Sequence, residues 1–393
     1  MHIFINALAA SAGGGLTYMR NVLPYLASKA DLKVTVALNT ALRQEFRSIG
    51  NVQYLELDIP AGRRFWYEQS SLPNVIRNCR ADVLLSTGNF AVRCSPVPQI
   101  LLSRNSIYVS ADFYRDLWRR REYRAWLDTR LRATAAKRSI KWATFTVAPS
   151  QAFAYELERW SGKRVMAIHH GFDQNAFIHN SRALAPELER KLKFPPKCIK
   201  LLFVSHYNYY RNFETLIRAL PVLRERLGGL PFRLMLSCHL HTNQKHGTYN
   251  PAEAAALVHR LGLREVVIEL GSIPYEQLHH LYARADAYVT PAYTETFAHP
   301  LVEAMASGVP IIASDLSVHR EICGEAAKYF PKFSSESLSE TVAKVVLSPQ
   351  LKSQLVDAGA RRSLQFSWKT HVNEILAVCE QALKSYSEVG PSS

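Results

Sequence analysis

The sequence has few features of secreted or membrane-spanning proteins. Its six cysteines stand singly, without a C-x-x-C pair, which excludes a dense disulfide framework and indicates reduced thiols in a cytoplasmic protein. No apolar run reaches the roughly 18 residues of a membrane span. The N-terminus, MHIFINALAASAGG, lacks the basic start and long apolar stretch of a signal peptide, so we interpret it as a first buried strand.

Acidic residues are scarce relative to basic ones, mostly in the first half of the chain. The formal charge is +15, and residues 1–190 hold 26 Lys/Arg against 15 Asp/Glu. Residues 113–141 alone contain ten basic and three acidic residues, interleaved with Phe113, Tyr114, Trp118, Tyr123, Trp126 and Leu131. This composition fits two solvated helices whose aromatic face packs on the protein, or attachment to an anionic membrane surface. Nucleic acid ranks behind both, because no recognition motif accompanies the charge.

Short apolar runs alternate with helical stretches along the whole chain. Runs at 2–8, 33–38 and 82–87 alternate with helical patterns at 17–28 and 66–79. After a proline-containing polar segment at 179–197, strand-like runs recur at 200–205, 232–237, 265–270, 287–290 and 310–314. Helical patterns fall between them at 213–227, 251–262, 275–284, 300–307 and 336–346, and a long one closes the chain at 369–386. This alternation predicts an α/β protein with two doubly wound, Rossmann-like domains that face a cleft.

The expected domain limits follow from this pattern and from the chain length of 393 residues, which exceeds what one core usually supports. Residues 1–188 should form an N-terminal domain, joined by a C-terminal helix at 370–388 that crosses back to it. Residues 189–369 should form the second domain, and residues 389–393 a disordered tail. Ligands of such sheets bind beyond the carboxyl ends of the strands.

Residues 286–315, DAYVTPAYTETFAHPLVEAMASGVPIIASD, predict a strand, a loop, a short helix opened by Pro300 and closed by Gly308, and another buried strand. The free N–H groups of such a helix start favour a phosphate. Glu303, near that start, can accept hydrogen bonds from the paired hydroxyls of a ribose, and Glu295 lies in the loop. The segment alone is equally compatible with a dipole-stabilised carboxylate and a surface glutamate.

In its spacing, Glu295-TFAHPLV-Glu303 resembles the Glu-x7-Glu motif of the retaining glycosyltransferases of family 4, which have the GT-B fold. The flanking segments GSIPYEQLHHLYARADAYVTPAYTE and AMASGVPIIASD resemble the donor-binding core of that family. The stretch FVSHYNYYRNFETLIRAL at 203–220 is similar to the family's strand, basic pair and helix, and VMAIHHGFDQNAF at 165–177 to the loop that ends its first domain. The resemblance extends across most of the chain.

The resemblance implies a role for each matching residue. Glu303 would hold the donor ribose, Glu295 the donor sugar, and Arg211 and His206 the diphosphate, so that Glu295, Arg211 and His206 are the catalytic candidates. Because histidine is only partly charged near neutrality, the contribution of His206 should depend on pH. The loop and the glycine-rich turn after the first strand would complete the donor site with Thr296, Phe297, Ala298, His299, Gly14 and Gly15.

Several positions depart from the family pattern. Thr296 and Ala298 stand where glycine is common, so a positive φ there is harder to reach. Arg104 and Asn105 fall near the place of a reaction-centre histidine. Asp-x-Asp is absent, which favours transfer without a metal. Two groups of possible metal ligands, His169 with His170, and Cys238 with His239, His241 and His246, lack an established ligand spacing, so we predict no metal site.

The resemblance implies a retaining hexosyltransferase that uses a nucleotide-diphosphate sugar as donor substrate and requires no cofactor. The expected partners are the nucleotide sugar, a lipid-linked or cell-surface polysaccharide acceptor and an anionic membrane surface at 113–141, without nucleic acid. The expected location is the cytoplasm, at the inner face of the plasma membrane. Two alternatives remain: a sugar-nucleotide 2-epimerase of the same architecture, and a subunit that binds the donor without turnover.

Overall fold

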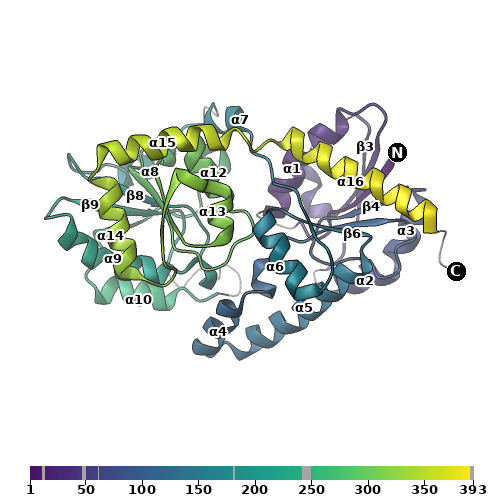
Figure 1. The fold of residues 1–393 in the computed structure, drawn as a ribbon, viewed down its shortest axis with the longest axis horizontal. Coiled ribbons are helices and arrows are strands. Elements are labelled where there is room, and N and C mark those ends of the chain that lie inside the picture. The colour runs from purple at the N-terminus through teal and green to yellow at the C-terminus, as the bar shows by residue number, and fades with distance from the viewer. Residues whose placement is uncertain (11–13, 47–49, 61, 180–181, 241–248, 390–393) are drawn as a thin grey trace. The chain divides into compact units, whose positions relative to one another are not determined.

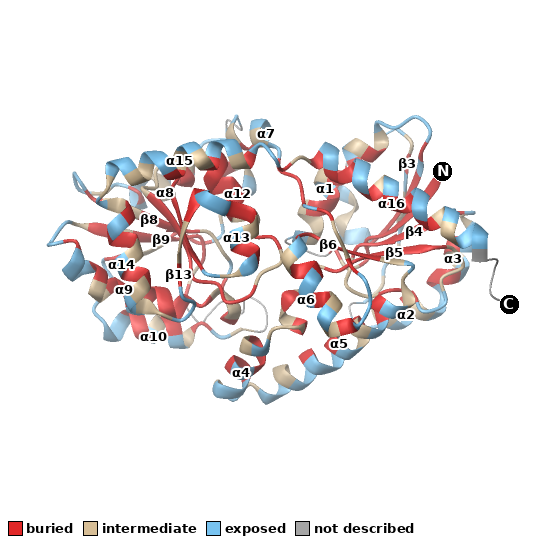
Figure 2. Ribbon diagram, viewed as in Figure 1, coloured by how far each residue is buried: buried red, intermediate tan, exposed pale blue. Residues whose placement is uncertain are grey.

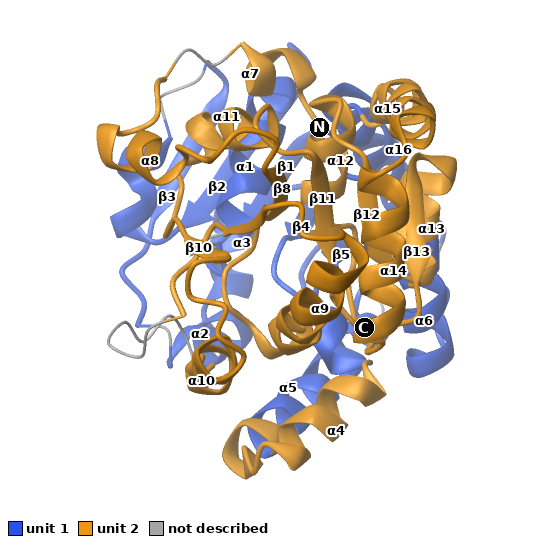
Figure 3. Cartoon of the chain, turned by 90° about the vertical axis from the view of Figure 1, so that its left-hand side faces the viewer, with its two compact units in different colours: residues 1–109, 127–171, 367–393 blue, residues 110–126, 172–366 orange. Residues whose placement is uncertain are grey.

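The computed structural model describes residues 1–10, 14–46, 50–60, 62–179, 182–240 and 249–389 (Figure 1). The chain divides into two compact units, coloured separately in Figure 3. Unit 1 comprises residues 1–109, 127–171 and 367–393, and unit 2 comprises residues 110–126 and 172–366. Each unit is built on its own parallel sheet.

The sheet of unit 1 has seven strands in the order β3-β2-β1-β4-β5-β6-β7, all parallel. Their bounds are β1 His2–Asn6, β2 Lys33–Leu38, β3 Val52–Glu56, β4 Val83–Ser86, β5 Gln99–Leu102, β6 Phe145–Ala148 and β7 Met166–Ala167. The helices of this unit are α1 Gly14–Ala27, α2 Arg64–Ser70, α3 Leu72–Asn78, α5 Tyr123–Trp142, α6 Gln151–Ser161 and α16 Trp368–Val389, with the short 3₁₀ helices η1 Thr40–Glu45 and η2 Ser106–Tyr108. Helix α5 begins in unit 2 and continues into unit 1.

Alternate residues of β1 enter cores on opposite faces of this sheet, as the period of a strand requires. Ile3 and Ile5 belong to a cluster with residues of α1 and α16, whereas Phe4 belongs to a second cluster with residues of α3. Helix α16 contributes to the first cluster at positions spaced three and four apart, namely Trp368, Val372, Ile375, Val378, Cys379 and Ala382. This apolar stripe explains why the C-terminal helix returns to unit 1.

The sheet of unit 2 has six parallel strands in the order β10-β9-β8-β11-β12-β13. Their bounds are β8 Ile199–Phe203, β9 Phe232–Leu236, β10 Val267–Glu269, β11 Ala287–Thr290, β12 Ile311–Ser314 and β13 Ala327–Phe330. Its helices are α4 Ala111–Arg119, α7 Gln174–Ile178, α8 Pro186–Lys191, α9 Phe213–Arg226, α10 Ala252–Arg260, α11 Leu278–Tyr282, α12 His299–Ala306, α13 Ser317–Cys323, α14 Ser335–Val346 and α15 Pro349–Ser363, with η3 Tyr209–Arg211, η4 Tyr275–Gln277 and η5 Gly324–Ala326. The strands of both sheets are largely buried (Figure 2).

The expected fold class, two doubly wound α/β sheets with the last helix returning to the first, is confirmed. One expected helix differs, since residues 66–79 form two helices, α2 and α3, that meet at Ser71. Pro73 lies in the first turn of α3, where a residue without an N–H group costs no hydrogen bond within the helix. The proline therefore starts a new helix instead of continuing α2.

The limits of the two units differ from the expected domain limits. The first change of unit near the middle of the chain falls after Gly171, and the expected limit at 188/189 lies inside unit 2. Residues 110–126, which precede that change, also group with unit 2. Apart from Val389, the tail expected at 389–393 lies outside the described residues.

Candidate functional site

The segment from β11 to β12 in unit 2 has the expected strand, loop, helix and strand. Helix α12 starts at His299, one residue before Pro300, and Gly308 follows it with a φ of +67°. Ala298 precedes the helix in the left-handed region, with a φ of +62°, although it is not glycine. Such a conformation costs a residue with a Cβ about 1–2 kcal/mol. The turn into α12 is therefore held by its surroundings against a local preference.

Glu303 is a buried carboxyl in α12, with 5% of its surface exposed. Burial raises the pKa of Glu303 to about 7, and the hydrogen bond from Tyr282 only partly opposes this. The Tyr282 hydroxyl donates to Oε2 of Glu303 at 2.8 Å. Helix α11 thus positions the carboxyl through one neutral donor, and Glu303 changes its protonation near neutral pH.

Glu295 forms an ion pair with Arg211, so the structure brings two of the three predicted catalytic residues together. Oε1 of Glu295 also accepts from the amide of Thr296 at 3.0 Å. Burial alone would raise the pKa of Glu295, but Arg211 and the Thr296 amide outweigh it and lower the pKa. For Arg211, burial disfavours the cation, and Glu295 reverses the effect and raises the pKa. Both groups are charged at neutral pH.

Backbone contacts join the loop that carries Arg211 to the loop that carries Glu295. The Tyr293 amide donates to the Tyr210 carbonyl oxygen at 3.0 Å. The side-chain amide of Asn212 donates to the Pro291 carbonyl oxygen at 3.0 Å, and Asn212 itself has a positive φ of 56°. These backbone contacts therefore hold the two loops that carry the ion pair in place. Asparagine tolerates the positive φ at position 212 better than most residues.

His319 lies behind this loop and is fully buried. Its Nδ1 contacts the Ser314 carbonyl oxygen at 2.8 Å, and since a carbonyl only accepts, Nδ1 carries the proton. Burial lowers the pKa of His319, so the ring is neutral. The Ser314 hydroxyl in turn donates to the Ala292 carbonyl oxygen, which ties β12 to the same loop.

Helix α4 is bonded to the loop that carries Glu295 through a largely buried ionic network. The Tyr293 hydroxyl donates to Asp116 at 2.9 Å, and Asp116 also accepts from Arg120 at 3.0 Å. Arg120 contacts two further carboxylates, Glu214 at 3.1 Å and Glu253 at 2.7 Å. This network explains why residues 110–126 belong to unit 2, and no local sequence signal marked it, since its members are far apart in the chain.

The other residues predicted for the donor site differ in exposure. Phe297 is buried and its ring centre lies 5.4 Å from that of Phe366, so its side chain anchors the loop. Thr296 uses its amide on Glu295, and His299 is half-buried at the start of α12. His206 is exposed in the loop after β8, where its carbonyl oxygen accepts from the Ser205 hydroxyl at 2.8 Å.

Gly14 and Gly15 belong to unit 1, at the start of α1, whereas Gly13 lies outside the described residues. A Cβ at Gly15 would come within 3.1 Å of the Ala10 backbone, so the turn is closely packed there. The Gly14 carbonyl oxygen accepts from Nη1 of Arg104 at 3.3 Å. Arg104, near the place of the family's histidine, thus contacts the predicted glycine turn.

The two possible metal clusters are not supported by the part of the chain that the structure describes. No group of three or more His, Cys, Asp or Glu side chains is close enough there to hold a metal. His170 packs against Tyr18 and Trp368, at 5.5 and 5.8 Å between ring centres. Burial raises the pKa of the Cys238 thiol to about 12, and His241 and His246 lie outside the described residues.

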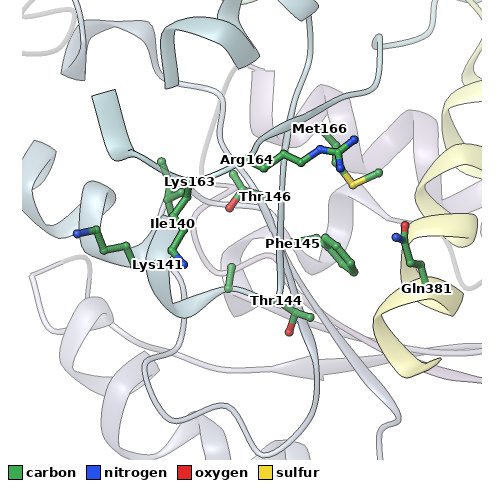
Figure 4. A pocket seen from close by; sticks show the side chains of 10 residues that line it. Ile140, Lys141, Thr144, Phe145, Thr146, Lys163, Arg164, Met166 and Gln381 are labelled. Carbon is green, nitrogen blue, oxygen red and sulfur yellow. The ribbon is translucent and has the colours of Figure 1, made fainter. Parts of the chain in front are cut away.

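Unit 1 contains a pocket of about 300 Å³ that the sequence did not indicate (Figure 4). Side chains from the end of α5, from the segment between α6 and β7, and from β6, β7 and α16 line it, including Lys141, Lys163, Arg164, Thr146 and Gln381. Strands β6 and β7 contribute their first residues, so the pocket lies at the amino ends of these strands. Ligands of parallel sheets bind at the opposite ends, and the pocket is therefore separate from the candidate site.

The sequence of residues 185–362 matches the family described as glycosyl transferases group 1. This match covers slightly less than half of the chain. The match contains Glu303, Glu295, Arg211 and the strands and loops that hold them.

Similar proteins include further glycosyltransferases. The D-inositol 3-phosphate glycosyltransferase of Actinosynnema mirum is 26% identical over 230 residues, which cover 57% of this chain and 54% of that protein. The MMP alpha-(1->4)-mannosyltransferase of Mycolicibacterium hassiacum is 33% identical over 131 residues, 32% of each chain. This chain thus spans about half the length of the first of these relatives.

Among solved structures, sucrose-phosphate synthase from Thermosynechococcus elongatus has a TM-score of 0.76 at 17% identity and covers 98% of this chain and 100% of its own. Anabaena HepE in complex with UDP and glucose has a TM-score of 0.70 at 17% identity and covers 97% and 100%. At such identities the likeness shows the fold alone. The predicted GT-B fold is confirmed.

Proposed function

We propose that the chain is a retaining glycosyltransferase that moves a hexose from a nucleotide-diphosphate sugar to an acceptor, without a metal. The observation that carries the proposal is the buried carboxyl of Glu303 and the Glu295 carboxyl, whose side chain is 10% exposed, with Arg211 paired to Glu295. Nε of Arg211 is buried and has no hydrogen-bond partner among the described residues. A ligand oxyanion would satisfy this donor.

In the proposed reaction, the Glu303 carboxylate accepts hydrogen bonds from the ribose hydroxyls, and Glu295 accepts from hydroxyls of the donor sugar. Negative charge develops on the departing diphosphate while positive charge develops on the sugar ring. Arg211 and His206, with the free amides at the start of α12, stabilise the leaving diphosphate. A front-side route, in which that phosphate helps to deprotonate the acceptor, needs no protein nucleophile and retains the anomeric configuration.

The relatives support a nucleotide sugar as the donor class. Anabaena HepE was solved with UDP and glucose, and several curated relatives are named mannosyltransferases. The proposal extends to a lipid-linked or cell-surface polysaccharide acceptor, which is consistent with relatives named phosphatidyl-myo-inositol mannosyltransferase and O-antigen chain mannosyltransferase.

A panel of UDP-, GDP- and dTDP-sugars tests the donor proposal. We expect one nucleotide class to raise the melting temperature of the wild-type chain, and Glu303→Ala to lower its affinity. Glu325→Gln is the matched control, because Glu325 is an exposed carboxyl of the same unit. If no nucleotide sugar stabilises the wild type, the proposal is wrong.

The same panel separates the alternatives. Appearance of a 2-epimerised nucleotide sugar without any acceptor would identify an epimerase. Donor binding with cellular glycan unchanged by Glu295→Ala would identify a subunit without turnover. Transfer with retention, abolished by the same substitution, is the outcome that our proposal requires.

We also propose that residues 113–141 attach the protein to an anionic membrane surface at the cytoplasmic face. Phe113 and Tyr114 are buried, whereas Trp118, Tyr123 and Leu131 are exposed, so only part of the aromatic face packs on the protein. Exposed arginines flank these side chains on α4 and α5. Exposed apolar groups beside cations suit the interface of anionic lipids. No helix within the described residues is long and apolar enough to cross a bilayer.

Flotation with vesicles that contain anionic lipid tests the attachment. The triple variant Arg121→Glu, Arg124→Glu, Arg138→Glu should float less, because these three side chains are exposed. Arg120 is left unchanged, since it lies in the buried network of unit 2. The control is Arg190→Glu, Arg260→Glu, Arg361→Glu, which makes the same charge change at exposed positions elsewhere. Equal flotation of both triple variants and the wild type would contradict the proposal.

A further inference from the structure

Arg104, which follows β5 in unit 1, is a cation without a carboxylate partner. Its Nη2 donates to the Thr87 carbonyl oxygen at 2.6 Å and its Nη1 to the Gly14 carbonyl oxygen at 3.3 Å. Its Cζ lies 4.7 Å from the centre of the Tyr18 ring. In the described part of the chain, no Asp or Glu lies within ion-pair distance of Arg104.

The charge of Arg104 is therefore held only by neutral groups. Burial lowers the pKa of Arg104, and Tyr18 opposes this, but a guanidinium remains protonated in proteins. Two of its five N–H groups have acceptors, and the described residues offer none to the other three. A part-buried cation without a counter-ion is costly, and such groups concentrate where a charged ligand binds.

Arg104 lies where a doubly wound sheet binds ligands. Strands β1 and β4 are neighbours in the sheet, and the chain proceeds from β1 to β2 on one side and from β4 to β5 on the other. The gap between two such strands, at their carboxyl ends, is the topological switch point. Arg104 bonds to Gly14 after β1 and to Thr87 after β4, and so bridges this point.

The surrounding contacts hold the guanidinium in place. Nδ1–H of His371 donates to the His169 carbonyl oxygen at 2.8 Å, so its Nε2 accepts from the Tyr18 hydroxyl at 3.0 Å. This fixes the ring beneath the guanidinium. The Arg104 amide donates to Oδ1 of Asn89 at 2.7 Å, which fixes the backbone. A rigid cation of this kind binds an oxyanion with little loss of side-chain entropy.

We propose that Arg104 binds an oxyanion group of the acceptor, such as a phosphate, at the switch point of unit 1. The inference rests on the proposed transferase function and names the class of acceptor it takes. The planar fork of arginine matches the geometry of phosphate, and a neutral sugar would leave the cation unpaired. The enzyme thus selects acceptors that carry a negative charge.

Calorimetric titration of the full chain with inorganic phosphate, with and without saturating UDP, tests the inference. We expect saturable binding to the wild type in both conditions. Arg104→Gln should weaken it by about tenfold to one hundredfold, as expected for loss of a charged hydrogen-bond pair. Arg104→Lys should fall between the two, since lysine keeps the charge and loses the fork. The exposed Arg93→Gln of the same unit is the control and should bind like the wild type.

UDP affinity separates the acceptor from the donor. We expect the UDP affinity of Arg104→Gln to stay within about twofold of the wild type. An equal fall in UDP affinity would assign Arg104 to the donor diphosphate and overturn the acceptor role. The acceptor role would also be overturned if Arg104→Gln bound phosphate like the wild type, or if the wild type showed no saturable phosphate binding. Should Arg104→Gln fail to fold, Arg104→Lys carries the comparison. Failure of the wild type to bind any of UDP, GDP and dTDP would contradict the proposed function only, because the titration without nucleotide still reports on Arg104.

Discussion

Replacing Glu303 by glutamine removes a buried charge and keeps the shape of the side chain. The carboxyl is 5% exposed, and its only described hydrogen bond comes from Tyr282. An amide oxygen at the same place can still accept that bond. The variant therefore isolates the cost of ionising Glu303 inside unit 2.

The magnitude follows from the pKa of Glu303, which burial raises from 4.5 in the unfolded chain to about 7, so that ionisation costs about 3 kcal/mol. Because the folded pKa is the higher one, the folded state binds the proton more tightly than the unfolded chain. The stability that the protonated group contributes is complete below pH 4.5 and is lost as the pH rises through 7. The Glu303→Gln variant lacks this loss. The difference in free energy of unfolding, variant minus wild type, should therefore rise by about 2.5 kcal/mol between about pH 5 and pH 8.

Chemical denaturation of both proteins at a series of pH values measures the difference, with the exposed Glu325→Gln as control. Donor affinity should change in the opposite direction and fall by about tenfold, because a neutral acceptor replaces a charged one. A stability difference that does not change with pH would refute the reasoning about ionisation. A more stable variant with full donor affinity would instead refute the role of Glu303 in binding the donor.

Arg120→Gln should destabilise unit 2 by about 3–5 kcal/mol, because it leaves Asp116, Glu214 and Glu253 without their shared buried cation; a denaturation midpoint like that of wild type would contradict the network. Ala298→Gly should stabilise the protein by up to about 1 kcal/mol, since glycine adopts the positive φ freely, and the greater entropy of glycine in the unfolded chain offsets part of this gain. A lower melting temperature would show that Ala298 is not strained. Arg211→Gln should lower kcat by about one hundredfold or more, and Arg211→Lys by less. Steady-state rates, with the exposed Arg224→Gln as control, test this, and an unchanged kcat would remove Arg211 from the mechanism.

The alternation of strands and helices was readable where buried strands are short apolar runs between turn residues, although the strands β5, β6 and β7 were not predicted. The strands at 33–38 and 287–290 match β2 and β11 in their limits. The edge strand β3 was missed, since Val52–Glu56 mixes exposed and buried residues and lacks a continuous apolar run. Strand β13 was missed for the same reason, since its middle residues are only partly buried.

The candidate site was readable where its residues are local in sequence. The loop and helix that carry Glu295 and Glu303 were predicted because Pro300 marks the start of the helix and Gly308 its end. Tyr282 was not predicted, because its contact with Glu303 spans 21 residues and leaves no periodic signal. Ala298 was expected to resist a positive φ, and the fold imposes one nevertheless.

The sequence by itself determined the class of fold and predicted the resemblance to a family and the two candidate carboxyls, because hydrophobic periodicity and motif spacing are properties of neighbouring residues. Tertiary structure decided what state those groups are in. It placed Arg211 against Glu295, left Glu303 with one neutral donor, and left Arg104 without a carboxylate. It also assigned residues 110–126 to unit 2. Charge, protonation and strain depend on partners that are distant in the chain, and only folding brings these together.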